Sequence, residues 1–222
     1  MTVSLELMNK NMIDGQLKPM GINDPIILEA FKNIPRELFV DKDKSSFSYY
    51  EGNILIKENR WLLSSMLIAR LINCVSISND DVILEIGSCT GYATAILEKL
   101  CSLVVGVEED PELRALANKT LAKIESNSSI IVGGQHILGN IKSAPYDKIF
   151  IFGSVEKVPN SLFDQLSDNG SLITVIKNKN NHKSCGNAVV FKKNKDIISS
   201  SKVFDVEVPF MEGFNIKEDF NF

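Results

Sequence analysis

Hydrophobic and polar positions follow different rules in the two parts of the chain. In the first part, residues 24–34 and 61–75 have the spacing and apolar face of amphipathic helices, and an Asp-Pro pair marks the start of the first one. From residue 81 onward, short continuous apolar runs alternate with helical segments. Continuous apolar strands separated by helices are typical of a parallel sheet covered on both faces. The pattern therefore predicts an α/β core preceded by a helical segment.

Seven apolar runs in the second part are predicted as strands, and helices are expected between several of them. The runs are 82–87, 102–108, 129–134, 146–153, 168–176, 187–193 and 201–210. The expected helices are 91–101, 110–126 and 158–166. The last two strands are expected to form an antiparallel pair at one edge. We predict a single domain over 1–222, with a helical segment over 1–75 and a Rossmann-like α/β core over 76–222.

A glycine turn, G-S-C-T-G at residues 87–91, follows the first predicted strand. Ligands of open α/β sheets bind at the carboxyl ends of the strands, and Gly87 and Gly91 allow a sharp turn and a close approach to the backbone. The next strand ends in Glu108, which is 21 residues after Gly87. An acid at about that distance commonly accepts hydrogen bonds from ribose hydroxyls. The alternative is a purely structural turn beside an exposed acid.

The spacing of the turn differs from the G-x-G-x-x-G pattern of dinucleotide sites. Its shorter spacing, together with Glu85 before it, favours S-adenosylmethionine, which has no pyrophosphate to bind. Cys89 stands where such turns usually have a glycine, and its thiol fits only if the local φ is negative. The predicted cofactor-binding residues are Glu85, Gly87, Ser88, Gly91, Glu108, Glu109, Gly134 and Gln135.

Composition excludes several other functions. A net charge of −4 gives no sign of a nucleic-acid surface. Four scattered cysteines without a C-x-x-C pair, and two histidines, argue against a metal site and fit a reducing cytoplasm. No run of 18 apolar residues occurs, and residues 1–16 lack the basic region and apolar core that are typical of a signal peptide. We therefore expect a cytoplasmic protein without a membrane partner.

Several motifs together resemble the protein-L-isoaspartate O-methyltransferase family. They are "GINDPIILEAFKNIPRELFV", "SYYEGN", "VILEIGSCTGYATAILEKL", "VVGVEEDPEL" and "APYDKIFIFGSVEKVPNSLFDQLSDNGSLITVI". They occur in one unbroken order over about residues 10–176, so the resemblance is far more specific than the glycine turn alone. It implies a monomeric, cytoplasmic repair enzyme that transfers a methyl group from S-adenosylmethionine to the α-carboxylate of isoaspartyl residues in damaged proteins.

The sequence departs from that family at two places. The family's G-x-x-I-S-Q-P loop corresponds here to "NRWLLSS", which puts Leu63 in place of the substrate-side serine. A slip of one residue makes Ser64 the candidate catalytic hydroxyl; the alternative is a surface or capping serine. The family's G-D-[GA] corresponds to residues 133–135, so the acid that faces adenine is replaced by Gly134. Gln135 and His136 are candidate substitutes.

Aromatic and basic residues near this loop are further candidates for structural or binding roles. Trp61 is expected to be a core aromatic residue that packs the N-terminal segment on the sheet. Arg36 is a candidate for holding a substrate carboxylate, and an internal salt bridge is the equal alternative. Tyr49 and Tyr50 are expected near the mouth of the site.

Three functions remain open at this stage. The first is an isoaspartyl-repair methyltransferase with a changed active-site loop. The second is a methyltransferase of the same fold with another acceptor, because the fold does not determine the acceptor. The third is a non-catalytic binding protein that keeps the fold. A carboxylate acceptor is already ionised at neutral pH and needs no general base. The lack of an obvious base in the sequence therefore excludes neither of the two methyltransferase functions.

Overall fold

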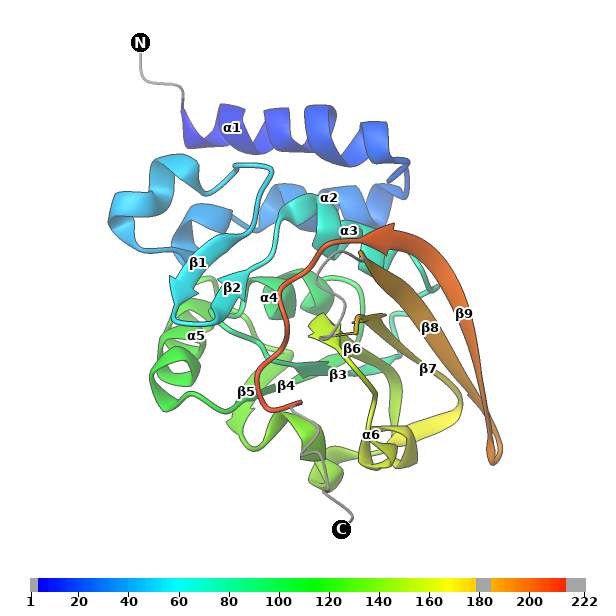
Figure 1. The fold of residues 1–222 in the computed structure, drawn as a ribbon. Coiled ribbons are helices and arrows are strands. Elements are labelled where there is room, and N and C mark those ends of the chain that lie inside the picture. The colour runs from blue at the N-terminus through cyan, green and yellow to red at the C-terminus, as the bar shows by residue number, and fades with distance from the viewer. Residues whose placement is uncertain (1–3, 179–184, 215–222) are drawn as a thin grey trace.

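The computed structural model describes residues 4–178 and 185–214 (Figure 1). The polar segment 177–186, which follows the fifth predicted strand in the sequence and is expected to be a loop, lies partly outside these residues. Seven strands form the main sheet. They are β3 (Val82–Ile86), β4 (Leu103–Glu108), β5 (Ser129–Gly133), β6 (Tyr146–Val155), β7 (Leu166–Ile176), β8 (Gly186–Asn194) and β9 (Ile197–Val206).

The strand order across the sheet is β5-β4-β3-β6-β7-β8-β9. Strands β3 to β7 are mutually parallel, whereas β8 and β9 run antiparallel to their neighbours. The predicted α/β fold with a seven-stranded, mostly parallel sheet is therefore confirmed. The chain moves from β3 outward to β5 and then returns to β6 on the other side of β3, so the carboxyl ends of β3 and β6 flank the topological switch point.

Both faces of the central parallel strands are buried, which explains why these strands are continuously apolar. Successive strand residues point to opposite faces, so Ile83 and Val104 join one hydrophobic cluster and Leu84 and Val105 join the other. In the described part of the chain, six α-helices accompany the sheet. They are α1 (Leu5–Met12), α2 (Pro25–Asn33), α3 (Ser65–Ile72), α4 (Tyr92–Glu98), α5 (Pro111–Lys123) and α6 (Asn160–Asp164).

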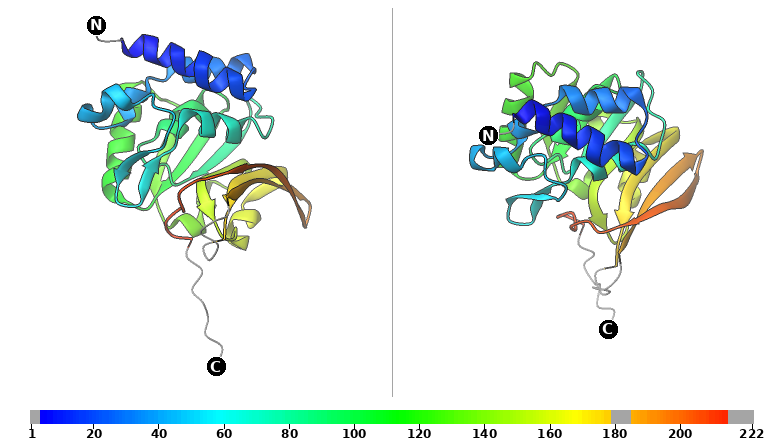
Figure 2. Two further views of the ribbon diagram at one scale, coloured as in Figure 1. Left: turned by 45° about the horizontal axis from the view of Figure 1, so that its top comes forward. Right: turned by 90° about the horizontal axis from the view of Figure 1, so that it is seen from above.

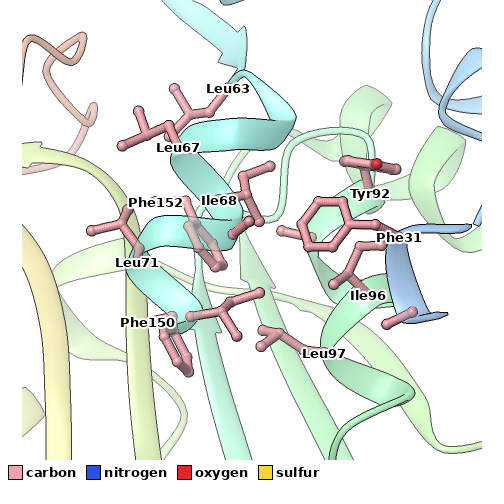
Figure 3. Close-up of a cluster of buried hydrophobic side chains, with 14 of the residues drawn as sticks. Phe31, Leu63, Leu67, Ile68, Leu71, Tyr92, Ile96, Leu97, Phe150 and Phe152 are labelled. Carbon is pink, nitrogen blue, oxygen red and sulfur yellow. The ribbon is translucent and has the colours of Figure 1, made fainter. Parts of the chain in front are cut away.

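The N-terminal helices pack on the same face of the sheet as α4. Figure 3 shows Leu67, Ile68 and Leu71 of α3 in one hydrophobic cluster with the phenylalanines of β6 and the side chains of α4. In Figure 2, α1 and α2 lie together on one side of the molecule, away from the β8–β9 hairpin. Helix α1 is a feature that the sequence pattern did not indicate, although Ser4 caps it by accepting from the N–H of Leu7.

The segment before α3 corrects one prediction. Residues 61–75 were expected to form a single helix, but β1 (Ile54–Lys57) and β2 (Arg60–Leu62) form an antiparallel hairpin, and α3 begins only at Ser65. Trp61 therefore lies on a strand with 36% of its surface exposed, so its assignment as a core aromatic residue is wrong. The apolar residues of β2 and of α3 follow one another almost directly in the sequence. The pattern therefore did not show where the strand ends and the helix begins.

Candidate functional site

The glycine turn after β3 has the predicted conformation. Gly87 and Gly91 have φ angles of 77° and 87°, and Gly91 immediately precedes α4. The N–H of Gly87 donates to the carbonyl of Val107 at 2.9 Å, and the N–H of Gly91 donates to the carbonyl of Ser88 at 2.8 Å. The turn is thus folded against the end of β4, where Glu108 lies.

Cys89 does not meet the condition of a negative φ. Its φ is 53°, in the left-handed region that favours glycine. The turn requires this conformation because the N–H of Cys89 donates to Oε2 of Glu108 at 2.8 Å. The side chain is buried, and burial raises the pKa of the Cys89 thiol to about 12. The thiol is therefore uncharged and adds bulk to the turn.

Glu108 at the end of β4 is fully buried and has an internal partner. Nη1 and Nη2 of Arg60 donate to its two carboxylate oxygens at 2.8 and 2.5 Å, which makes the pair bidentate. The N–H groups of Cys89 and Asp110 donate to the same carboxylate at 2.8 and 3.0 Å. Arg60 belongs to β2, so the hairpin of the altered loop reaches the predicted ribose acceptor.

The C-terminal residues 208–214, which we call the covering segment, cross the same edge of the sheet (red in Figure 1). The N–H of Ser154 donates to Pro209 at 2.9 Å, and the N–H of Met211 donates back to Ser154 at 2.8 Å. A Cβ atom built at Gly87 would lie 2.5 Å from Sδ and Cε of Met211, and one built at Gly153 would lie 2.9 Å from Cε. The Met211 side chain therefore lies at the switch point between β3 and β6.

Little space remains at this edge. A cavity of about 20 Å³ lies among residues of the hairpin, the strand ends and the covering segment. Its lining is Asn59, Arg60, Trp61, Leu63, Gly87, Phe152, Gly153, Pro209, Phe210 and Met211. A volume of this size holds about one water molecule, whereas pockets for small organic ligands measure roughly 300–1,000 Å³.

Glu85 lies beneath the turn, with a different set of partners. It is 1% exposed and accepts hydrogen bonds from the hydroxyls of Ser88, at 3.1 Å, and Thr94. Burial raises the pKa of Glu85 to about 7, against the opposing effect of the two hydroxyls. This carboxylate therefore supports the turn from below.

The residues after β5 join the tip of β4 to the covering segment. Oε1 of Glu109 accepts from the N–H of His136 at 2.5 Å, and Nε2 of His136 accepts from the N–H of Glu109 at 3.3 Å. Nδ1 of the buried His136 lies 3.0 Å from the carbonyl of Glu212, so it donates there in the matching tautomer. Gln135 is exposed. A Cβ at Gly134 would meet its first neighbour at 3.5 Å, so there is room for a side chain.

The loop before α3 places its serine and leucine in structural positions. Ser64 is buried and caps α3 by accepting from the N–H of Leu67 at 3.3 Å. Leu63 is part of the hydrophobic core. Its carbonyl accepts from Nη2 of Arg36 at 2.7 Å, and Nε of Arg36 donates to the carbonyl of Ser48 at 2.6 Å.

Arg36 and the two tyrosines lie away from the cavity. Arg36 is fully buried with its guanidinium 4.7 Å from the ring centroid of Tyr92, so it positions the loop and is inaccessible to a substrate. Tyr49 is buried and donates to Glu37 at 2.6 Å. Tyr49 and Tyr50 line a different hollow, which they share with α1.

The residues predicted to bind the cofactor thus lie around the carboxyl-end edge of the sheet, but two residues at the centre of this edge were not predicted. Arg60 and Met211 fill the space above Gly87 and Glu108. A lone arginine in the altered loop was the available signal for the first; nothing in the sequence pattern indicated the second. Within residues 4–178 and 185–214, no cluster of three or more potential metal ligands occurs. No helix in this described part is long and apolar enough to cross a membrane.

Comparisons with known proteins agree with this fold. The family model "Protein-L-isoaspartate(D-aspartate) O-methyltransferase (PCMT)" matches residues 7–212. A protein-L-isoaspartate O-methyltransferase of Protochlamydia amoebophila is 33% identical over 162 residues, which cover 73% of this chain and 77% of that protein. One from Syntrophobacter fumaroxidans is 29% identical over 174 residues, which cover 78% of this chain and 81% of that protein.

Solved structures extend the likeness to the whole architecture. A protein-L-isoaspartate O-methyltransferase structure superimposes with a TM-score of 0.81 at 26% identity, covering 95% of this chain and 67% of the other. A Plasmodium falciparum structure, in complex with S-adenosyl-L-homocysteine, gives a TM-score of 0.74 at 18% identity, covering 95% and 99%. The family model also spans both the glycine turn and Arg60. The chain therefore belongs to the protein-L-isoaspartate O-methyltransferase family.

Proposed function

We propose that this chain is an S-adenosylmethionine-dependent O-methyltransferase that methylates a carboxylate of damaged proteins, with isoaspartyl residues as its acceptor. The observation that carries the proposal is the meeting of the glycine turn with Glu108, joined by the 2.8 Å hydrogen bond from the N–H of Cys89. The match of the methyltransferase family model to residues 7–212 supports methyl transfer as the reaction at this site.

The residues proposed to bind the cofactor surround one edge of the sheet, but the conformation described does not fit it. They are Glu85, Gly87, Ser88, Gly91, Glu108, Glu109, Gly134 and Gln135. Arg60 occupies both oxygens of Glu108, and Met211 covers Gly87. S-adenosylmethionine, once bound, supplies an activated methyl group; the side chains of this chain must first make room for it.

On the acceptor side, the chain offers little polar chemistry. A carboxylate is ionised at neutral pH, so its reaction depends on alignment more than on proton transfer. Leu63 lines the small cavity with an apolar side chain, and a charged acceptor beside it is poorly solvated. Ser64 as the hydroxyl partner stays a prediction, because its Oγ accepts from the N–H of Leu67.

Three further expectations are kept as proposals. A single domain is supported by the hydrophobic cluster that α1, α2 and α3 share with the sheet. A reducing, cytoplasmic location is supported by free cysteines at 74, 89, 101 and 185. We also propose that the chain acts as a monomer.

A second candidate function is a protein of this family that does not transfer methyl groups. The filled cleft favours it, since Arg60 satisfies Glu108 without any ligand.

Methyl transfer from labelled S-adenosylmethionine to an isoaspartyl peptide, with the matching aspartyl peptide as control, tests the proposal. The expected result is alkali-labile label in the isoaspartyl peptide alone. Cofactor binding without transfer to that peptide would indicate another acceptor. Absence of both binding and transfer would favour the second candidate.

A further inference from the structure

The acceptor positions of Glu108 are fully used within the protein. A carboxylate offers about four lone-pair directions, and four donors reach this one: two from Arg60 and the N–H groups of Cys89 and Asp110. The two N–H groups are fixed by the backbone of the turn and the start of α5. A ribose that binds Glu108 through both hydroxyls must therefore displace Arg60.

Arg60 is held in place by the β1–β2 hairpin. Lys57 of the same hairpin lies 2.6 Å from Asp110 and 2.7 Å from Glu112, at the start of α5. Lys57 and Glu112 are 45% and 80% exposed, and Asp110 is 19% exposed. Arg60 and Glu108 are 5% and 0% exposed. The hairpin thus docks on the tip of β4 and the start of α5 through one buried ion pair and one more exposed set of ion pairs. Removal of one partner of the buried pair leaves an uncompensated buried charge, whereas loss of an exposed ion pair has a small effect.

Met211 is placed at the switch point by its main chain. The covering segment is bound to Ser154 by three hydrogen bonds: from the N–H of Ser154 to Pro209, from the N–H of Met211 to Ser154, and from Oγ of Ser154 to Val208 at 3.1 Å. Farther along, His136 contacts the carbonyl of Glu212 at 3.0 Å. The backbone is therefore anchored on both sides of a flexible thioether side chain, which can itself change rotamer.

Arg60 and Met211 meet over the same glycine. A Cβ built at Gly87 would lie 2.5 Å from Met211 and 3.8 Å from Nη2 of Arg60. A ligand that approaches the free face of Gly87 therefore meets both side chains at once. The remaining cavity of about 20 Å³ has no space for a nucleoside.

From these contacts we infer that the cofactor cleft is occluded by the protein itself, with Arg60 competing for Glu108 and Met211 covering Gly87. This inference rests on the proposed function, because it concerns the same site. It names Arg60 and Met211 as the residues that limit the affinity for S-adenosylmethionine. When only a small fraction of molecules is open, the apparent dissociation constant is the intrinsic constant divided by that fraction.

Calorimetric titration with S-adenosyl-L-homocysteine tests this inference on the full chain. Arg60→Gln and Met211→Ala should each bind at least about tenfold more tightly than the wild type, because each removes one occupant and enlarges the open fraction. The double variant should bind more tightly than either. Met211→Ala leaves the ion pair intact, so it keeps the test valid if Arg60→Gln does not fold.

Two matched variants serve as controls. Lys57→Gln removes the exposed ion pairs of the same hairpin, and Met20→Ala shortens an exposed methionine far from the cleft. Both should bind within about twofold of the wild type, since exposed ion pairs contribute little.

The outcomes separate this inference from the proposed function. Tighter binding by the variants without methyl transfer by any protein would support occlusion and refute the proposed function. Tight binding by the wild type that the variants do not improve would overturn occlusion and leave the function intact. Absence of binding by every protein would overturn both.

Discussion

The floor and the cover of the cleft are in contact, but only the floor has the arrangement expected of a cofactor site. The floor consists of the strand ends and the turn between them: Glu85, residues 87–91 and Glu108. The cover consists of Arg60 on the β1–β2 hairpin and Met211 on residues 208–214. The floor keeps the arrangement of a cofactor site, whereas the cover fills it. A floor with the residue pattern of a cofactor site therefore does not by itself determine whether a ligand can enter.

Removal of the floor's charge should have the largest effect. Glu108→Gln leaves the buried guanidinium of Arg60 without its counter-charge, so the free energy of unfolding should fall by about 3–5 kcal/mol. Urea unfolding at pH 7 measures this change. Glu112→Gln, at an ion pair that is 80% exposed on the acidic side, is the control and should have an effect below about 1 kcal/mol. Equal losses in the two variants would show that the buried pair does not stabilise the cover.

Glu85 should make the free energy of unfolding decrease as the pH rises, whereas an acid in a salt bridge makes it increase. Its pKa is raised to about 7 in the folded protein by burial, above the value of 4.5 for a free side chain. The folded state thus holds a proton that the unfolded state releases between these pH values. Stability from this group is complete below pH 4.5 and is lost as the pH rises through 7, by about 3 kcal/mol in total.

The difference between wild type and Glu85→Gln isolates this contribution from that of other acids. Unfolding at a series of pH values from 4.5 to 8 should show a smaller decline in the variant. Parallel curves for the two proteins would mean that Glu85 is already ionised in the folded state.

Cys89 tests the backbone of the floor. Its φ of 53° suits glycine, so Cys89→Gly should be more stable than Cys89→Ala by about 1–2 kcal/mol, although both lose the thiol. Thermal or urea unfolding of the two variants gives this difference directly. A more stable alanine variant would contradict the left-handed conformation of residue 89.

Ser64 tests the junction between the β1–β2 hairpin and α3. Because its hydroxyl caps the helix, Ser64→Ala should lower the free energy of unfolding by about 1 kcal/mol. Methyl transfer should then fall only in proportion to the folded fraction. A much larger loss of turnover in fully folded protein would identify Ser64 as the hydroxyl that contacts the acceptor.

The floor was predictable from sequence because its signals are local. The apolar run, the glycines and the acid 21 residues later all follow from strand ends that lie side by side in a parallel sheet. Outside the floor, the capping role of Ser64 was one of the two alternatives that the sequence left open for this residue. The positive φ of Cys89 was missed because a residue type does not exclude a strained conformation when a hydrogen bond to Glu108 requires it.

The cover was not predictable for a physical reason. Arg60 and Glu108 are 48 residues apart, and Met211 is more than one hundred residues from Gly87 in the chain. Contacts at such separations depend on how the hairpin and the C-terminal segment dock, and no periodicity encodes that docking. The hairpin itself was hidden because the apolar residues of β2 run directly into α3.

A crystal structure of the wild-type chain grown with saturating S-adenosyl-L-homocysteine tests the central claim most directly. If Arg60 and Met211 occlude the cleft, the ribose hydroxyls should bind Glu108, Arg60 should have left its 2.5 Å contact with that carboxylate, and the Met211 side chain should have moved away from Gly87. A structure in which the ligand lies beside Gly87 while the bidentate Arg60–Glu108 pair is intact would contradict it.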